Sequence, residues 1–169
     1  GSSGSATIED PDAFGTVSGN SMIRGILIDA KGLGTTAQSF RLHDNGGIRN
    51  SDTGTPTVIS GNITLEDAWG GNAKCFAGGG DMQITGTIAP DSGSRELSRV
   101  GQGTLTISGA CNPNGAATIT GGSLILDHST DNTSKLTASS GLTLRGAAVT
   151  LRGSDSASSS QTVDNLTVG

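Results

Sequence analysis

The sequence predicts an all-β fold: a β-solenoid in which about seven coils stack and their strands pair in parallel. Gly contributes 28 of the 169 residues and aromatic residues only 2%, so the core must be aliphatic. The apolar residues are mostly β-branched or Leu. They alternate with polar residues in short runs, which favours strands over helices or disorder.

A short signature marks the ends of strands and recurs along the chain: an aliphatic residue, then Ser or Thr, then Gly. Successive copies lie 42, 25, 23 and 12 residues apart. These spacings fit a period of roughly 21–25 residues, with 42 as two turns and 12 as about half a turn, which is the size of a solenoid repeat. The copies are Val17-Ser18-Gly19, Ile59-Ser60-Gly61, Ile84-Thr85-Gly86, Ile107-Ser108-Gly109 and Ile119-Thr120-Gly121.

Stacking explains how such short strands become stable. A short run cannot bury its apolar face alone, but stacked coils bury a continuous column of Ile, Leu and Val. Gly and Asn then occupy the corners, where a positive φ recurs. An antiparallel β-sandwich is the alternative, because its short strands also come at regular intervals. The sandwich does not require recurring Ser/Thr-Gly corners, so the solenoid is preferred.

The first part of the chain divides into a lead-in and a region rich in strands. Residues 1–15 are polar and irregular and are interpreted as a lead-in or linker, and residues 16–169 form a single predicted solenoid domain. Within it, 22–30 is the most apolar run and predicts a buried strand. The next stretch, 31–57, alternates short apolar segments with turn residues, and 57–67 predicts a pair of strands.

The second part carries the clearest strand patterns. A Gly-rich loop over 68–81 leads to a predicted strand over 82–90. The stretch 99–126 holds two strand-like runs, which the half-turn spacing places on different faces of a coil. The last strands are predicted in 134–154, where GLTLRG is followed by its near copy AVTLRG, and in 161–169.

The segment GQGTLTISGA…NGAATITGGSLIL resembles the autotransporter-associated β-strand repeat. The resemblance is best over 46–126, loose over 127–169 and weak before residue 46. It implies a right-handed parallel β-helix, an exported or cell-surface location and a passenger or stalk role. The chain departs from the family pattern at Cys111-Asn112-Pro113, in a loop where a disulfide or a partner contact could be added. The matching residues are Gly101, Gly103, Thr104, Leu105, Thr106, Ile107, Ser108, Gly109 and Ala110, followed by Gly121, Gly122, Ser123 and Leu124.

Charge and hydropathy argue against two kinds of partner. The net charge is −5 and the ten basic residues are spread out, so no surface is expected to neutralise the phosphates of a nucleic acid. No apolar run approaches the ~20 residues of a transmembrane helix. The chain does not open on a signal peptide, so the export signal of an exported protein would lie outside this segment.

Cys75 and Cys111 are the two cysteines, too few for a structural zinc site. Two interpretations remain open. The pair forms a disulfide if the Cα atoms come within ~7 Å, or the two residues are separate, small, buried thiols.

No catalytic, cofactor or metal site is predicted. His43 and His128 lack an accompanying Gly-x-Ser-x-Gly nucleophile motif, so both are expected as loop residues. Glu66-Asp67, Asp127 and Asp131 are candidates for a sugar-cleaving carboxylate pair. Aromatic platforms are scarce, so these are expected as solvated corner residues. Calcium suits Asp- and Asn-rich loops, but neither an EF-hand nor a complete Gly-Gly-x-Gly-x-Asp motif is present.

Composition and resemblance together predict a non-enzymatic structural or adhesive segment of an exported bacterial surface, stalk or filament protein. The expected partners are adjacent repeats or further copies of the chain stacked end to end, with surface glycans as a second class. Two alternatives stay open: a carbohydrate-active or tailspike-like β-helix, and a glycan-binding adhesin module.

Overall fold

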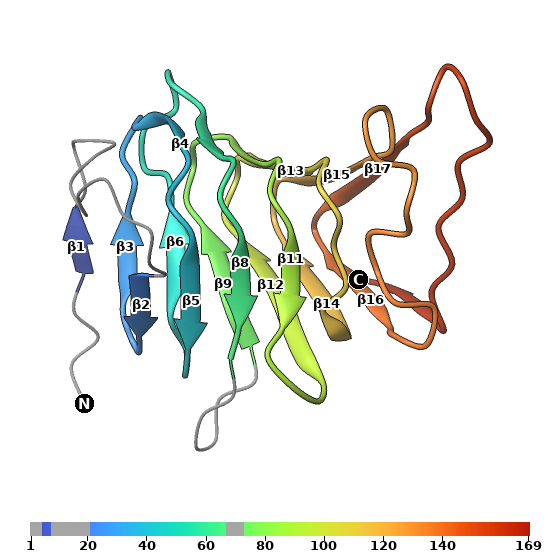
Figure 1. Ribbon diagram of the computed structural model, residues 1–169, viewed down its shortest axis with the longest axis horizontal. Helices are drawn as coiled ribbons and strands as arrows, with labels where there is room; N and C mark the ends of the chain where they lie inside the picture. The colour runs from blue at the N-terminus through green and yellow to red at the C-terminus, as the bar shows by residue number, and fades with distance from the viewer. Residues whose placement is uncertain (1–4, 8–20, 67–72) are drawn as a thin grey trace.

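The protein is a parallel β-solenoid. The computed structural model describes residues 5–7, 21–66 and 73–169, and all regular structure in these residues is β-strand. The described strands pair in parallel, and the chain matches a right-handed parallel β-helix of about six turns (Figure 1). The predicted solenoid is confirmed and the antiparallel sandwich is excluded. The number of coils is about six, one fewer than predicted.

Three parallel sheets form the walls of the solenoid, and each of the first four coils passes through sheet B, then sheet A, then sheet C. Sheet B, at the front of Figure 1, has four strands: β2 (Ser21–Arg24), β5 (Phe40–His43), β8 (Ile63–Leu65) and β11 (Ile88–Pro90). Sheet A has eight: β1 (Ser5–Thr7), β3 (Leu27–Asp29), β6 (Gly47–Arg49), β9 (Ala73–Ala77), β12 (Arg95–Val100), β14 (Asn114–Thr120), β16 (Leu142–Arg145) and β18 (Leu166–Val168). Sheet C has six: β4 (Gly34–Thr36), β7 (Thr57–Ile59), β10 (Met82–Ile84), β13 (Thr104–Ile107), β15 (Ser123–Asp127) and β17 (Ala148–Arg152).

The coils are numbered here from the first sheet B strand. Coils 1 to 4 begin at β2, β5, β8 and β11 and hold one strand of every sheet. Coil 5 runs from Cys111 through β14 and β15, and its sheet B position is reduced to one bridge between Ile88 and Cys111. Coil 6 runs from residues 133–137, which form no strand, through β16 and β17. Strand β1 precedes coil 1, and β18 follows coil 6.

The coils differ in length, which accounts for the smaller count. Ser21 pairs with Phe40, 19 residues further on, whereas Gly47 pairs with Cys75, 28 residues further on. Long connections, among them 153–165, take up residues that an even period would assign to another coil. Strand β1 lies within the stretch 1–15, which the sequence pattern had indicated as a lead-in.

The predicted signature marks equivalent positions in the coils. Ile59, Ile84 and Ile107 lie in register in β7, β10 and β13. Ile119 lies in β14 of sheet A, so the half-turn spacing does place it on another face. The copy at Val17 lies outside the described residues. Side chains of this column are fully buried, and each contributes about 1.5–3 kcal/mol through burial of apolar surface.

Two runs predicted as single strands each contain two strands around a corner. The run 22–30 holds parts of β2 and all of β3, separated by Gly25 at φ +64°, and 82–90 holds β10 and β11. The corner that follows each signature strand in sheet C explains why the last residue of the signature is Gly. A Cβ atom on Gly86 would lie 2.0 Å from the carbonyl oxygen of Gly61 in the coil before it, and one on Gly109 would lie 2.1 Å from that of Gly86. Only Gly lets these corners stack at the strand spacing.

Candidate functional site

Sheet B carries a ladder of backbone hydrogen bonds that stops at Cys111. In each of the first four coils, an inward-facing position donates its N–H to a carbonyl of the next coil at 2.7–3.0 Å. In the described residues no such bond continues from Cys111 to coil 6. The donor–acceptor pairs are Ser21–Ser39, Phe40–Asn62, Ile63–Thr87 and Ile88–Ala110.

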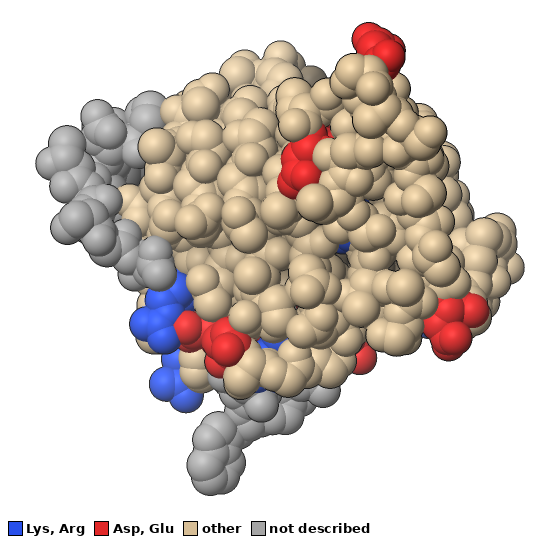
Figure 2. All heavy atoms as spheres, turned by 45° about the vertical axis from the view of Figure 1, so that its right-hand side comes forward, with Lys and Arg blue, Asp and Glu red and all other residues tan. Residues whose placement is uncertain are grey.

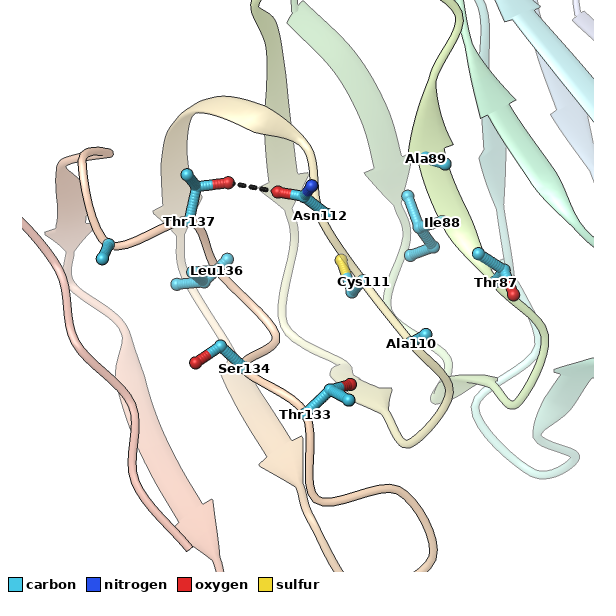
Figure 3. A pocket seen from close by; sticks show the side chains of 11 residues that line it. Thr87, Ile88, Ala89, Ala110, Cys111, Asn112, Thr133, Ser134, Leu136 and Thr137 are labelled. Carbon is cyan, nitrogen blue, oxygen red and sulfur yellow. Dashed lines mark hydrogen bonds between the residues drawn. The ribbon is translucent and has the colours of Figure 1, made fainter.

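A groove of about 470 Å³ lies where the next rung would be, between coil 5 and coil 6 (Figure 3). This volume falls in the range of small-molecule sites. Small or hydroxyl-bearing side chains dominate the lining, and Cys111 and Leu136 face each other across it (Figure 3). The lining residues are Thr87, Ile88, Ala89, Ala110, Cys111, Asn112, Thr133, Ser134, Leu136, Thr137 and Ala138.

Contacts at the two ends of the groove hold the coils together. At one end, Thr137 Oγ1 donates to Asn112 Oδ1 at 2.5 Å (Figure 3). At the other, Lys135 Nζ donates to the carbonyl oxygens of Ser108 at 3.1 Å and Gly109 at 3.0 Å. Coils 5 and 6 are therefore joined beside the groove but not along it.

Lys135 is a completely buried lysine that sequence reasoning missed. Its ammonium group also donates to the carbonyl oxygen of Asp131 at 2.7 Å and lies 3.4 Å from the Asp131 carboxylate. Burial would raise the pKa of Asp131, but hydrogen bonds from Thr133 and the charge of Lys135 outweigh it, so this pKa is lowered. Within the sequence, Lys135 stands in a polar stretch and carries no signal of burial.

A side-chain amide replaces a strand on the other side of coil 6. Gln161 Oε1 accepts hydrogen bonds from the N–H groups of Lys135 at 2.7 Å and Leu136 at 3.1 Å. Its Nε2 donates to the Leu136 carbonyl at 2.8 Å. One carboxamide thus satisfies both backbone groups of Leu136, in the manner of a peptide bond from a neighbouring strand.

The two cysteines are separate free thiols, so the disulfide considered above is not formed. Cys75 lies in β9 of sheet A, whereas Cys111 bridges to sheet B. Burial raises the pKa of Cys75, with the Ser98 hydrogen bond and the Arg99 charge acting in the opposite direction. Burial raises the pKa of Cys111 to about 12 despite the charge of Lys135, so its thiol stays protonated at neutral pH.

The structure does not bring the two histidines together. His43 ends β5, where its Nδ1 lies 3.3 Å from Asp44 Oδ2, so the expectation of a loop residue is wrong there. His128 lies in the connection after β15 as expected, but it is completely buried. Within the described part of the chain, neither of its ring nitrogens has a hydrogen-bond partner.

Two of the candidate carboxylates, Glu66 and Asp127, pair with arginines of neighbouring coils, whereas Asp131 lies beside Lys135. Arg41 Nε donates to Glu66 Oε1, and Arg152 donates to Asp127 Oδ2 at 2.9 Å. Glu66 and Asp127 are each only 5% exposed, so the expectation of solvated corner residues is wrong for both. Asp67 lies outside the described residues. Glu66 and Asp127 are buried because the coils stack, which places an arginine of the adjacent coil over each carboxylate.

The described residues hold neither a clustered set of metal ligands nor a helix that could span a membrane. No group of three or more His, Cys, Asp and Glu side chains is placed to hold a metal ion. None of the described segments forms a helix long and apolar enough to cross a membrane. In the view of Figure 2, charged side chains lie in small separate groups and most of the surface is uncharged.

The C-terminal end of the solenoid exposes its apolar interior. β17 and β18 are exposed along their whole length, each paired with a strand on one side only. A cavity of about 260 Å³ opens between them. Four large apolar side chains at this end are 38–71% exposed: Val149, Leu151, Leu166 and Val168.

Comparisons of the chain with protein-family models, with curated proteins and with solved structures found no match in any of the three. The class of protein that the fold defines is a parallel β-helix built from repeated coils.

Proposed function

We propose that this chain is a non-enzymatic structural segment of an exported bacterial surface, stalk or filament protein, in which coils stack end to end. The observation that carries the proposal is the C-terminal end. Its exposed apolar side chains and two one-sided strands are the features that a further coil would cover.

The way in which the coils are joined supports a structural role. Arginine–carboxylate pairs connect coil 1 to coil 2 through Arg49 and Asp29, and coil 5 to coil 6 through Arg152 and Asp127. Glu66 and Asp127, two of the candidate carboxylates, likewise pair with arginines of adjacent coils, which supports a structural role for them. The resemblance of 46–126 to autotransporter-associated repeats supports an extracellular location and a passenger or stalk role.

The test is self-association measured by sedimentation velocity over a wide range of concentrations. Wild-type protein is expected to form head-to-tail oligomers, because burying the open end removes apolar surface from water. The double variant Leu166→Lys/Val168→Lys is expected to remain monomeric. Val100→Lys changes an equally apolar exposed residue in the middle of sheet A and is expected to associate like wild type. A wild type that stays monomeric throughout, with unchanged circular dichroism, would overturn the proposal.

A second candidate function is glycan binding, favoured by a row of hydroxyls on the outer face of sheet A. Ser98, Thr118 and Thr143 occupy one register position in β12, β14 and β16, and Thr167 continues it in β18. The row presents neutral hydrogen-bonding groups at the strand spacing of about 4.8 Å. Retention on immobilised polysaccharides, lost in Thr118→Val/Thr143→Val, is the expected result. Equal retention of both proteins would exclude this face.

A further inference from the structure

We propose that the groove between coils 5 and 6 binds an extended, uncharged peptide, which adds a strand to sheet B at Cys111. This inference is independent of the proposed stacking, because the groove lies on the side of the solenoid and the open strands lie at its end.

The backbone of Cys111 carries the proposal. The bridge between Cys111 and coil 4 is formed by the backbone groups of the two residues that flank Cys111. The Ala110 carbonyl accepts from Ile88 N–H at 2.8 Å, and Asn112 N–H donates to the Ile88 carbonyl at 3.0 Å. In a parallel ladder, the N–H and C=O of Cys111 itself therefore point to the opposite side, towards coil 6. In the described residues, neither group has a hydrogen-bond partner.

Coil 6 does not supply the missing partners. Following the pattern of the other coils, Cys111 N–H would donate to the Lys135 carbonyl and Thr137 N–H to the Cys111 carbonyl, and neither bond is present in the described chain. Coil 6 makes its backbone contacts on the far side, where the N–H groups of Lys135 and Leu136 bond to Gln161. Since Cys111 is only 3% exposed, its unpaired N–H and C=O incur a cost that a ligand with matching groups would remove.

The chemistry of the ligand follows from these two groups. An amide is a donor and an acceptor at fixed separation, and the Gln161 amide already fills the equivalent place beside Leu136. A peptide in the extended conformation presents such groups in register, which is the basis of strand addition. Ala89, Ala110 and Ala138 line the groove, and their small side chains leave room for an apolar side chain of the ligand. A charged peptide is disfavoured, because the lining contains no charged residue.

The test uses the fact that the chain has only two cysteines. Protein labelled with ¹⁵N-cysteine gives two amide signals, and Cys75→Ser assigns them. The probe is acetyl-Thr-Ile-Ala-amide, which copies residues 87–89, the segment that pairs with Cys111 from coil 4. On titration the Cys111 amide signal is expected to move downfield and saturate, and its hydrogen exchange to slow. The Cys75 signal is expected to stay in place, because β9 already pairs on both sides.

Three controls make the result specific. The same peptide with N-methylalanine lacks the N–H that would reach the Cys111 carbonyl and is expected to bind about tenfold more weakly. Ser134→Trp fills the groove from an exposed position and is expected to abolish the response, whereas Ser160→Trp, exposed but outside the lining, is expected to retain it. Equal binding of the N-methylated peptide, an unmoved Cys111 signal, or protection of Cys111 that grows with protein concentration alone would overturn the proposal; the last result would indicate a contact between copies of the chain.

Discussion

Buried charged side chains link neighbouring coils throughout this protein. Asp29 and Asp127 pair with arginines one coil away, and Lys135 reaches back from coil 6 to two carbonyl oxygens of the preceding corner. Arg99, almost completely buried, points inward between Phe76 and Ile119 and donates to the Gly78 carbonyl at 2.9 Å. Breaking one partner of such a pair leaves a buried charge unpaired, so these residues have a larger effect on stability than surface ion pairs.

The Asp127 carboxylate makes stability depend on pH. Burial would raise its pKa, but hydrogen bonds from Ser129 and the contact with Arg152 outweigh this, so the folded-state pKa lies below the unfolded value of about 3.9. The stabilisation is therefore present above about pH 4 and lost as the pH falls through the lower folded pKa. Asp127→Asn is expected to lower the free energy of unfolding near neutral pH but to match wild type more closely in acid, as measured by urea denaturation.

Asp155→Asn is the matched control for this experiment, because Asp155 is exposed and lies in the connection after β17. It is expected to follow the wild-type pH profile. A constant difference between Asp127→Asn and wild type from neutral to acid pH would contradict the assigned role of the carboxylate.

Corners, more than strands, determine how closely the coils stack. Most strands are only three to five residues long and gain stability from their neighbours above and below. The corners hold Gly against backbone of the adjacent coil, as at Gly86 on Gly61 and Gly109 on Gly86. The signature therefore recurs once per coil because its Gly must fit against the backbone of the adjacent coil.

Replacing Gly86 separates this steric effect from conformational preference. Gly86→Ala is expected to destabilise the fold by more than about 3 kcal/mol, because the new Cβ would lie 2.0 Å from backbone that cannot move independently. Gly25→Ala is the control: Gly25 has φ +64° but no atom within 4 Å of the added Cβ, so the left-handed conformation alone should cost about 1–2 kcal/mol. Equal losses in thermal or urea denaturation would show that the corner relaxes.

The repeating parts of this molecule were predictable and the groove was not. Ile59, Ile84 and Ile107 recur because each must occupy the same buried column. Their spacing therefore gives the length of a coil and predicts the solenoid. The groove depends instead on the path of residues 128–141, a polar connection without periodicity. From the sequence, Lys135 is expected to be an ordinary exposed lysine, and no hydrophobic pattern around His128 predicts that it is buried. Only the departure from the repeat at Cys111-Asn112-Pro113 indicated that something differs there.

The complete solenoid is a one-dimensional stack in which each coil contacts only its neighbours. Central coils are covered on both sides, whereas coil 6 and β18 are covered fully on one side only. The stability of such a protein is expected to fall from the middle towards an open end.

Hydrogen exchange measured by mass spectrometry tests this gradient. Amides of β17 and β18 are expected to exchange at least about tenfold faster than those of β10 and β13, because opening the end requires breaking one interface between coils rather than two. The proposed end-to-end stacking predicts that the difference shrinks as the protein concentration rises. Uniform protection along the chain at low concentration would show that the whole solenoid opens as one cooperative unit.

The unequal lengths of the three sheets give the C-terminal end a stepped shape. β18 of sheet A stands one rung beyond β17 of sheet C, while sheet B ends earlier, at the Cys111 bridge. A flat end would accept a neighbouring coil in several rotational positions. A stepped end accepts only a coil whose own sheets begin at complementary heights. The stepped end therefore fixes the rotation of the coil that stacks on it. Any filament built in this way would have one fixed twist.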